Sequence, residues 1–159
     1  MIVMADVNPL DAVVSLLTTN YLSTNTDNII PTIAIVYEKP TDKEPKPNED
    51  LIFVYSEIGT RTSIGLGVPE RAEVTDVVKI DIRSRPANTS QSTKINDNHA
   101  RKVLGEVNRV IYSKLVTPGT NYDVIDPQIE LTDLSNGMRG VFRYIIKIRL
   151  IDYCRDMTT

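Results

Sequence analysis

The sequence predicts a single α+β domain spanning all 159 residues, with two helices packed on one face of a largely antiparallel or mixed β-sheet. Two segments, 9–22 and 94–114, repeat apolar residues at helical spacing, whereas the segments between and after them are rich in β-branched residues or alternate apolar with polar residues. A content of 41% hydrophobic and 25% charged residues is that of an ordinary globular protein. The expected order is helix, strand, strand, strand, helix, strand, strand, ending in a long C-terminal hairpin.

The first predicted helix runs from Pro9 to Leu22. Asn8 can cap its amino end, Pro9 suits the first helical position, and Asp11 places a negative charge in the first turn. Its apolar residues follow at helical spacing, namely Leu10, Val13, Val14, Leu17 and Tyr21.

Three strands are expected between the helices, at 32–37, 51–55 and 74–83. The third shows the clearest alternation, because its even-numbered residues are mostly apolar and its odd-numbered residues are mixed and charged. We therefore expect the even-numbered face of this strand to pack against the helices.

Two segments between these elements are expected to be flexible or to bind a partner. Segment 39–50 has three prolines and no apolar residue larger than proline, so it is predicted to be a solvated loop. Segment 59–71 is rich in glycine and small residues and carries two apolar anchors, Ile64 and Leu66.

The second predicted helix, 94–114, has one apolar stripe and is stopped by Pro118-Gly119. Its charged residues are expected to lie off the stripe, namely Asp97, Arg101, Lys102, Glu106 and Arg109. A hairpin follows, with strands at 125–134 and 139–153. The expected core comprises Leu17, Val107, Ile111, Ile146 and Ile148.

The helix-free face of the sheet would carry alternating charged and apolar residues, namely Val77, Lys79, Asp81, Arg83, Arg143, Ile145, Lys147, Arg149 and Ile151. Such a face is either simply solvated or forms an oligomer interface or pore wall. The sequence leaves both interpretations open.

Motifs for catalysis or cofactor binding are not found in the sequence. A lone histidine, His99, and a lone cysteine, Cys154, cannot form a Cys/His zinc site. His99 has no nucleophile motif near it and is expected to be exposed on the second helix. Gly65-Leu66-Gly67 lacks the third glycine of a dinucleotide-binding loop, because Glu70 occupies its place. We therefore expect no enzymatic activity, no cofactor and no metal.

A metal-dependent nuclease is the least weak enzymatic alternative. Its carboxylates would be those on the predicted strands, with Lys79 among them, namely Asp76, Asp81, Asp126 and Glu130. Asp76 and Asp81 are an odd number of residues apart, so they face opposite sides of a regular strand.

The charge and hydropathy of the chain exclude further classes. With 18 Lys and Arg against 21 Asp and Glu, the net charge of −3 gives no general affinity for nucleic-acid phosphates. No stretch approaches the length of apolar sequence that a membrane span needs, and the N-terminus does not have the features of a signal peptide. The expected location is the cytoplasm or a virion.

The organisation of the chain resembles that of the tail-terminator proteins of tailed bacteriophages, which complete the tail and join it to the head. The resemblance covers nearly the whole chain and is one of pattern and size. Its parts are an opening helix at 8–22, a strand at 33–37, two strands around a loose loop at 51–83, a helix with an Arg/Lys-dotted apolar stripe at 99–115, and a final hairpin ending in 145–150. The proline-rich loop is longer than the family needs.

The resemblance implies a structural virion protein without catalytic residues. Its subunits would close into a ring, usually a hexamer, on the last ring of the tail tube. The ring would stop tube polymerisation, offer its other face to the head-completion proteins of the neck, and leave a channel through which DNA passes. Such a protein is assembled in the host cytoplasm and becomes part of the tail or neck of the virion.

For a ring of this kind we expect the basic stripe of Arg143, Lys147 and Arg149 to lie at the subunit interface, together with Ile64 and Leu66. The lumen or the interface is the expected place of Lys79, Asp81 and Arg83. Other classes remain as alternatives: another neck or tail component, such as a head-closure or tube protein, the nuclease described above, or an adaptor domain of a cellular complex.

Overall fold

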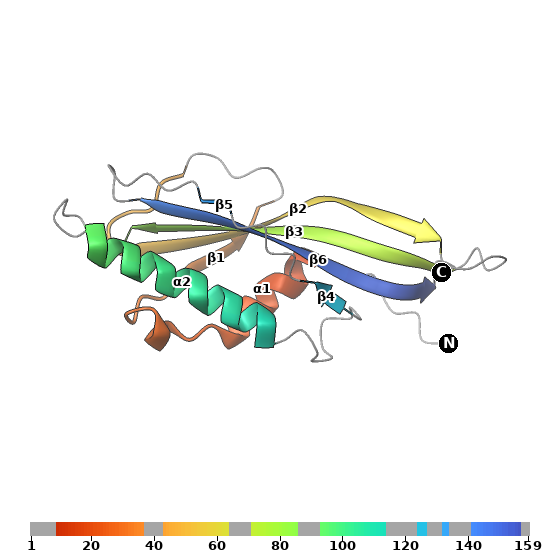
Figure 1. Cartoon of the computed structure of the whole chain (residues 1–159), viewed down its shortest axis with the longest axis horizontal. Helices are drawn as coiled ribbons and strands as arrows, with labels where there is room; N and C mark the ends of the chain where they lie inside the picture. The colour runs from red at the N-terminus through yellow and green to blue at the C-terminus, as the bar shows by residue number, and fades with distance from the viewer. Residues whose placement is uncertain are drawn as a thin grey trace.

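One mixed sheet with two helices on one of its faces makes up the fold (Figure 1). The computed structural model describes residues 9–36, 43–63, 71–85, 93–113, 124–126, 132–133 and 141–156. In chain order the elements are α1 (Pro9–Asn20), the 3-10 helix η1 (Ser23–Asn25), β1 (Thr32–Ile35), β2 (Glu49–Ser63), β3 (Arg71–Arg85), α2 (Thr93–Ser113), β4 (Val124–Asp126), β5 (Thr132–Asp133) and β6 (Phe142–Asp156).

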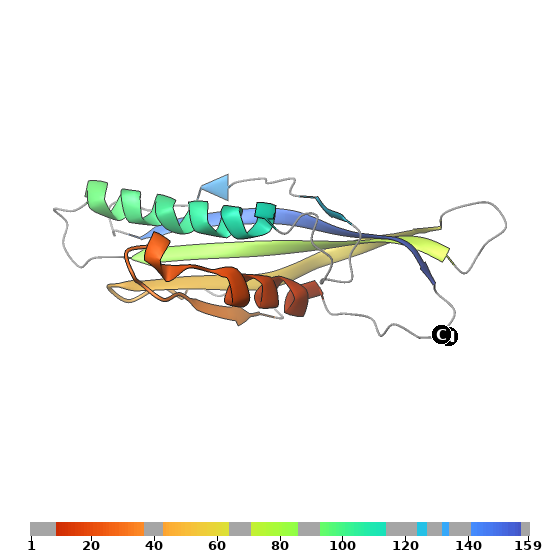
Figure 2. The same ribbon diagram turned by 90° about the horizontal axis from the view of Figure 1, so that it is seen from below.

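The strand order in the sheet is β1-β2-β3-β6-β4, and β5 also pairs with β6. β1 is parallel to β2, and every other pairing is antiparallel. This is the α+β domain with a largely antiparallel or mixed sheet that the sequence predicts. α1 lies over β1 and β2, and α2 lies over β3 and β6, so both helices cover the same face (Figures 1 and 2).

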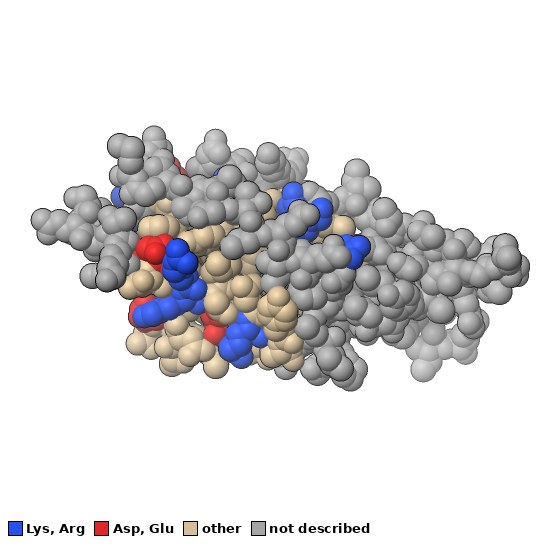
Figure 3. Space-filling model, in the orientation of Figure 1, with Lys and Arg blue, Asp and Glu red and all other residues tan. Residues whose placement is uncertain are grey.

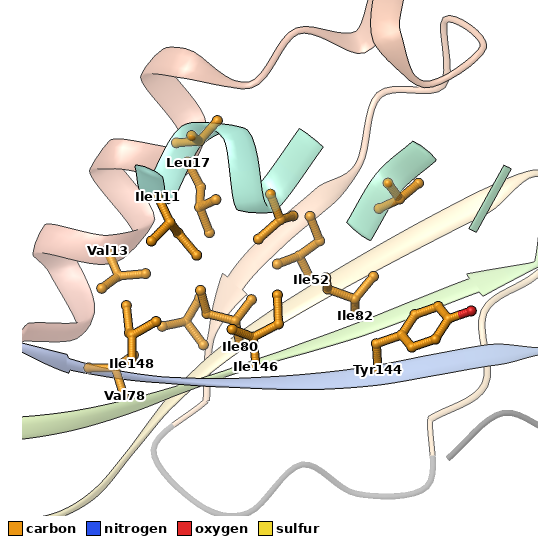
Figure 4. Packing of buried hydrophobic residues seen from close by; sticks show 14 of the residues in the cluster. Val13, Leu17, Ile52, Val78, Ile80, Ile82, Ile111, Tyr144, Ile146 and Ile148 are labelled. Atoms are coloured by element: carbon orange, nitrogen blue, oxygen red, sulfur yellow. The ribbon is translucent and has the colours of Figure 1, made fainter. Parts of the chain in front are cut away.

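Alternation along β3 and β6 decides which residues reach the core. Val78 and Ile80 of β3 pair directly with Ile148 and Ile146 of β6, and all four are buried beneath the helices (Figure 4). The five core residues expected from the sequence are all buried, namely Leu17, Val107, Ile111, Ile146 and Ile148. The apolar faces of the two helices and of both strands are thus confirmed.

The β2–β3 hairpin is longer than the sequence predicts. β2 begins at Glu49 and runs to Ser63, and β3 begins at Arg71. Three parts of the expected loops are therefore strand, namely 49–50, 59–63 and Arg71, and that part of the prediction is wrong. Hydrogen bonds between the backbones of β2 and β3 do not depend on side-chain polarity. The pairing of the two strands therefore continues through polar residues that a hydrophobic pattern does not mark as strand. Residues 37–42 and 64–70, with Ile64 and Leu66, lie outside the described residues.

Two bulges interrupt the strand pairing at the end of the sheet that extends past the helices (Figure 1). From Glu57 to Thr60 β2 advances three residues while β3 advances two, from Val77 to Thr75. A second shift lies between β3 and β6, next to Ala72. One extra residue in a strand bends it and exchanges the faces of the residues beyond. The first bulge contains Gly59, where the sequence was expected to leave the strand.

The first strand of the expected C-terminal hairpin is described only in part. The predicted strand 125–134 is seen as β4 and β5, which pair with β6 at two separate places, at 149–151 and at 144–145. The expected turn at 135–137 lies outside the described residues. The helices match their predictions to within two residues at each end.

Replacing Ile146 by alanine should lower the free energy of unfolding by about 2–5 kcal/mol, because it removes a fully buried side chain between the sheet and the helices. Urea titration gives the measurement. Ile145→Ala is the matched control, since Ile145 is half-buried on the opposite face, and it should cost less. A larger loss for Ile145→Ala than for Ile146→Ala would mean that the faces of β6 are assigned wrongly.

Candidate functional site

The second face of the sheet, opposite the helices, gathers charged side chains from two paired strands. β3 contributes Lys79, Asp81 and Arg83, and β6 contributes Arg143, Lys147 and Arg149. Arg83 pairs directly with Arg143, and Lys79 pairs directly with Lys147, so cations stand opposite cations in the register. Like charges in such positions repel, and an acid nearby is needed to hold them.

Asp81 supplies that acid for the two arginines. Its carboxylate is fully buried and accepts hydrogen bonds from Nε and Nη2 of Arg143, at 3.1 and 2.8 Å. Nη2 of Arg83 donates to the same carboxylate at 3.1 Å, and Nε approaches it at 3.4 Å. Arg83 also donates from Nη1 to the carbonyl oxygen of Lys43, and its guanidinium lies 5.2 Å from the centre of the Phe53 ring. Asp81 and its two arginines form a built ionic cluster inside the subunit.

The predicted interface and lumen residues differ in how far the subunit itself buries them. Asp81 and Arg83 were expected on a lumen or interface; the structure instead buries both side chains inside the subunit. Arg143 is 24% exposed and has its acid within the same chain. Lys79, Lys147 and Arg149 are half-buried on the second face.

Arg149 stands opposite Val77 on one side and opposite Asp126 of β4 on the other. Its interface role, and that of Lys147, stay predictions.

Of the carboxylates weighed for a nuclease, the three that the structure describes do not all lie on one face of the sheet. Asp76 pairs with Leu150, so it belongs to the helix-covered face, whereas Asp81 and Asp126 belong to the second face. Asp81 is already held by two arginines. Glu130 lies outside the described residues. Among the residues described, no group of three or more His, Cys, Asp or Glu side chains is suited to hold a metal ion.

His99 is the centre of a second polar cluster, between α2 and the rest of the domain. It is only 2% exposed, so the expectation of an exposed histidine is wrong. Nδ1 lies 2.8 Å from Oδ2 of Asp27, and Nε2 lies 2.9 Å from Oδ2 of Asp50. The spacing holds a signal for this burial, because His99 precedes Val103 of the apolar stripe by four residues, one helical turn.

A serine next to this histidine does not make a catalytic triad. The hydroxyl of Ser84 donates to Oδ1 of Asp50 at 2.6 Å, and both ring nitrogens of His99 face carboxylates. Ser84, Asp50 and His99 are all buried. In a triad the nucleophile is hydrogen-bonded to the histidine and can reach a substrate. Ser84 is instead hydrogen-bonded to Asp50 and is buried, so it meets neither condition.

The charges of this cluster shift each other's titration. Burial by itself lowers the pKa of His99, but hydrogen bonds to Asp50 and Asp27 outweigh burial and raise that pKa above its ordinary value. Hydrogen bonds from Lys102 and from His99 lower the pKa of Asp27. The Nζ–Oδ1 distance between Lys102 and Asp27 is 2.7 Å.

Glu106 anchors the same segment further along α2. It was expected on the polar side of the helix, and this is wrong, since it is buried. It accepts hydrogen bonds from the backbone N–H of Leu22 and from Nδ2 of Asn25, each at 2.8 Å, and from Arg109. Burial raises the pKa of Glu106, but hydrogen bonds from Arg109, Asn25 and Leu22 outweigh it and lower the pKa to about 2.

Both acidic and basic side chains therefore line the contact of α2 with residues 20–29, and Figure 3 shows Lys and Arg next to Asp and Glu over α2.

A comparison of the sequence with models of known protein families and with curated proteins finds no match. Within the described part of the chain, no helix is long and apolar enough to span a membrane.

Asp81→Asn should lower the free energy of unfolding by about 3 kcal/mol, since it removes a buried anion that two arginines share. Asp97→Asn is the control, because the Asp97–Arg101 pair is exposed and should contribute about 0.5 kcal/mol or less. Both variants are measured by urea denaturation. Equal losses would show that the Asp81 cluster is no more important than a surface pair.

Glu106→Gln should make the free energy of unfolding less dependent on pH in the acidic range. The pKa of Glu106 is lowered on folding, so its stabilising effect is complete above its ordinary value of 4.5 and is lost as pH falls toward about 2. The difference in unfolding free energy between wild type and variant should therefore shrink as pH falls through that range. A difference that stays constant with pH would contradict the charged role of Glu106.

Proposed function

We propose that the protein is a structural subunit of a tailed-bacteriophage virion, which closes into a ring at the end of the tail tube. In this role it stops tube polymerisation and joins the tail to the head-completion proteins, and the ring leaves a channel for DNA. The observation that carries the proposal is an arm of three long strands that extends past the helix-covered core (Figure 1).

The arm consists of the strand residues beyond the first bulge and their partners on β6, namely 60–63 of β2, 71–75 of β3 and 151–156 of β6. Its sequence is mostly polar, and in the first two strands Val74 is the only aliphatic residue larger than alanine. A small sheet without a hydrophobic face is marginally stable in water. The arm therefore gains from further contacts outside its own subunit.

Both outer edges of the arm are open within the described part of the chain. β1 pairs with β2 only over 51–54, so no described strand lies beside 55–63 on that side. On the opposite edge, β4 pairs with 149–151, and no described strand lies beside 152–156. An open strand edge is a template for pairing with another chain.

The two edges belong to different strands, which favours a ring over a simple dimer. Pairing the β2 edge of one subunit with the β6 edge of the next is a heterologous contact, and such contacts close into a ring when the rotation fits. β2 and β6 are both antiparallel to β3, so they run in the same direction. The joint between equally oriented subunits would then be a parallel strand pair.

The mass of the native assembly tests the proposal. We expect a closed ring, a hexamer as in the family that the sequence resembles. Fibres of indefinite length would favour a tube protein instead, and a monomer at every concentration and in the presence of tail tubes would contradict the proposal.

Ser56→Pro should prevent ring formation and leave the subunit folded. The Val54 carbonyl accepts from the Val36 N–H, so the backbone groups of Val54 and, two residues on, of Ser56 point to the open edge of β2. Proline at Ser56 removes an outward donor and no bond to β3. Ser56→Thr keeps the donor and is the matched control. If both variants assemble alike, the β2 edge is not the joint.

A further inference from the structure

The turn after η1 is held in an unusual conformation. Asp27 and Asn28 both have positive φ, 53° and 60°, a region that non-glycine residues rarely adopt. Asp and Asn enter this region more readily than other non-glycine residues, but usually as single residues, so two in succession mark a defined turn. Thr26 is buried beside them, and the side chain of Asp27 reaches across to His99 and Lys102 of α2.

The contact with His99 depends on a proton. Both ring nitrogens lie within hydrogen-bond distance of carboxylate oxygens, Nδ1 at Asp27 and Nε2 at Asp50. An ionised carboxylate only accepts, so both nitrogens must carry a hydrogen for both bonds to exist. The bridge between the two acids therefore requires the imidazolium form.

We propose that His99 is a proton-operated clamp, which holds the turn of residues 26–28 against α2 while its ring is charged and releases this turn when the ring loses a proton to solvent. The proposal concerns the subunit itself and does not depend on the proposed ring.

The burial of the two acids decides which bond is lost. Asp50 is fully buried, so solvent cannot reach it to replace a lost donor, and it also accepts from Ser84. The side chain of Asp27 is 46% exposed, so water can solvate it. The neutral ring keeps its one N–H, on Nε2, bonded to Asp50. Nδ1 then carries a lone pair that faces the carboxylate of Asp27, and the lone pair and the carboxylate repel each other.

Other groups around the ring set the strength of the clamp. On α2, Lys102 holds Asp27 from the outside and keeps a part of the contact after the proton leaves. Tyr21, which precedes η1, is close enough to Asp50 for that carboxylate to act on its titration. Glu106, two turns along α2, is engaged with Leu22, Asn25 and Arg109. Among these groups, His99 is the one whose ordinary pKa, 6.5, lies near neutral pH.

The sign of the pH dependence follows from the raised pKa of His99. The clamp is fully present at pH values where the ring is charged whether the turn is open or closed, and it is lost as pH rises through the raised pKa that His99 has with the turn closed. Between the pKa of His99 with the turn open and its pKa with the turn closed, each pH unit should increase the open population of the turn about tenfold.

Amide hydrogen exchange at a series of pH values tests the clamp. The readouts are the Asn28 and Ile29 amides, which donate to the carbonyls of Ser23 and Thr26. After correction for intrinsic exchange, their protection should fall about tenfold per pH unit in that range, while Val107 in the core of α2 stays unchanged. His99 is the only histidine, so its ring resonances report its titration directly.

Three variants separate the clamp from general loosening. Asp27→Asn should remove the pH dependence, because the carboxylate that repels the neutral ring is gone. Lys102→Gln is the matched control: it weakens the hold on Asp27 at every pH but should keep the pH step. His99→Gln should leave the turn unprotected throughout. Because His99→Gln risks unfolding the protein, the other two variants decide.

Two results would overturn the proposal. One is protection of Asn28 and Ile29 that does not change while the His99 resonances titrate. The other is a pH step that Asp27→Asn leaves intact.

Discussion

The pairing of β3 with β6 is the constraint on which the other parts of the molecule depend. The two strands stay in register from Ser84 and Phe142 to Val74 and Asp152, so alternate residues are fixed to one face or the other. A slip of one residue would move Asp81 toward the helices and Ile80 away from them. Such a slip would expose apolar residues of one face and would bury the charged residues of the other face among the helices. Both faces therefore fix the register of β3 against β6.

The helices, the apolar faces and the order of elements along the chain can be predicted from sequence because they follow from local periodicity. Val78 and Ile80, or Ile146 and Ile148, need no knowledge of partners to be assigned to a core. The strand ends are different. Gly59 interrupts the pattern and suggests a loop, but the β2–β3 ladder absorbs it in a bulge and continues to Ser63. The extent of a strand is decided by its neighbour in the sheet, and a single segment contains no information about that neighbour.

The polar clusters were hidden from sequence reasoning for a related reason. His99 and Glu106 occupy positions next to Val103 and Val110 on the inner side of α2, so helical spacing alone marks them as inward-facing. A polar residue is nevertheless assigned to the surface unless its partners are known. Those partners, Asp27, Asp50 and the 20–25 segment, are far away in the sequence, and only folding brings them to α2.

The two faces of the sheet stabilise a buried carboxylate in different ways. On the second face, Asp81 is held by arginines, which stay charged at any pH the folded protein meets, so this cluster is fixed. Near the helices, Asp50 is held by a histidine, whose charge depends on pH near neutrality. On that side the three acids Asp27, Asp50 and Glu106 face the three bases His99, Lys102 and Arg109, and the balance holds only while the imidazole is charged. Because its cations are arginines, the Asp81 cluster keeps its positive charges as pH changes. Because its cation is a histidine, the Asp50 cluster can lose a positive charge when pH rises.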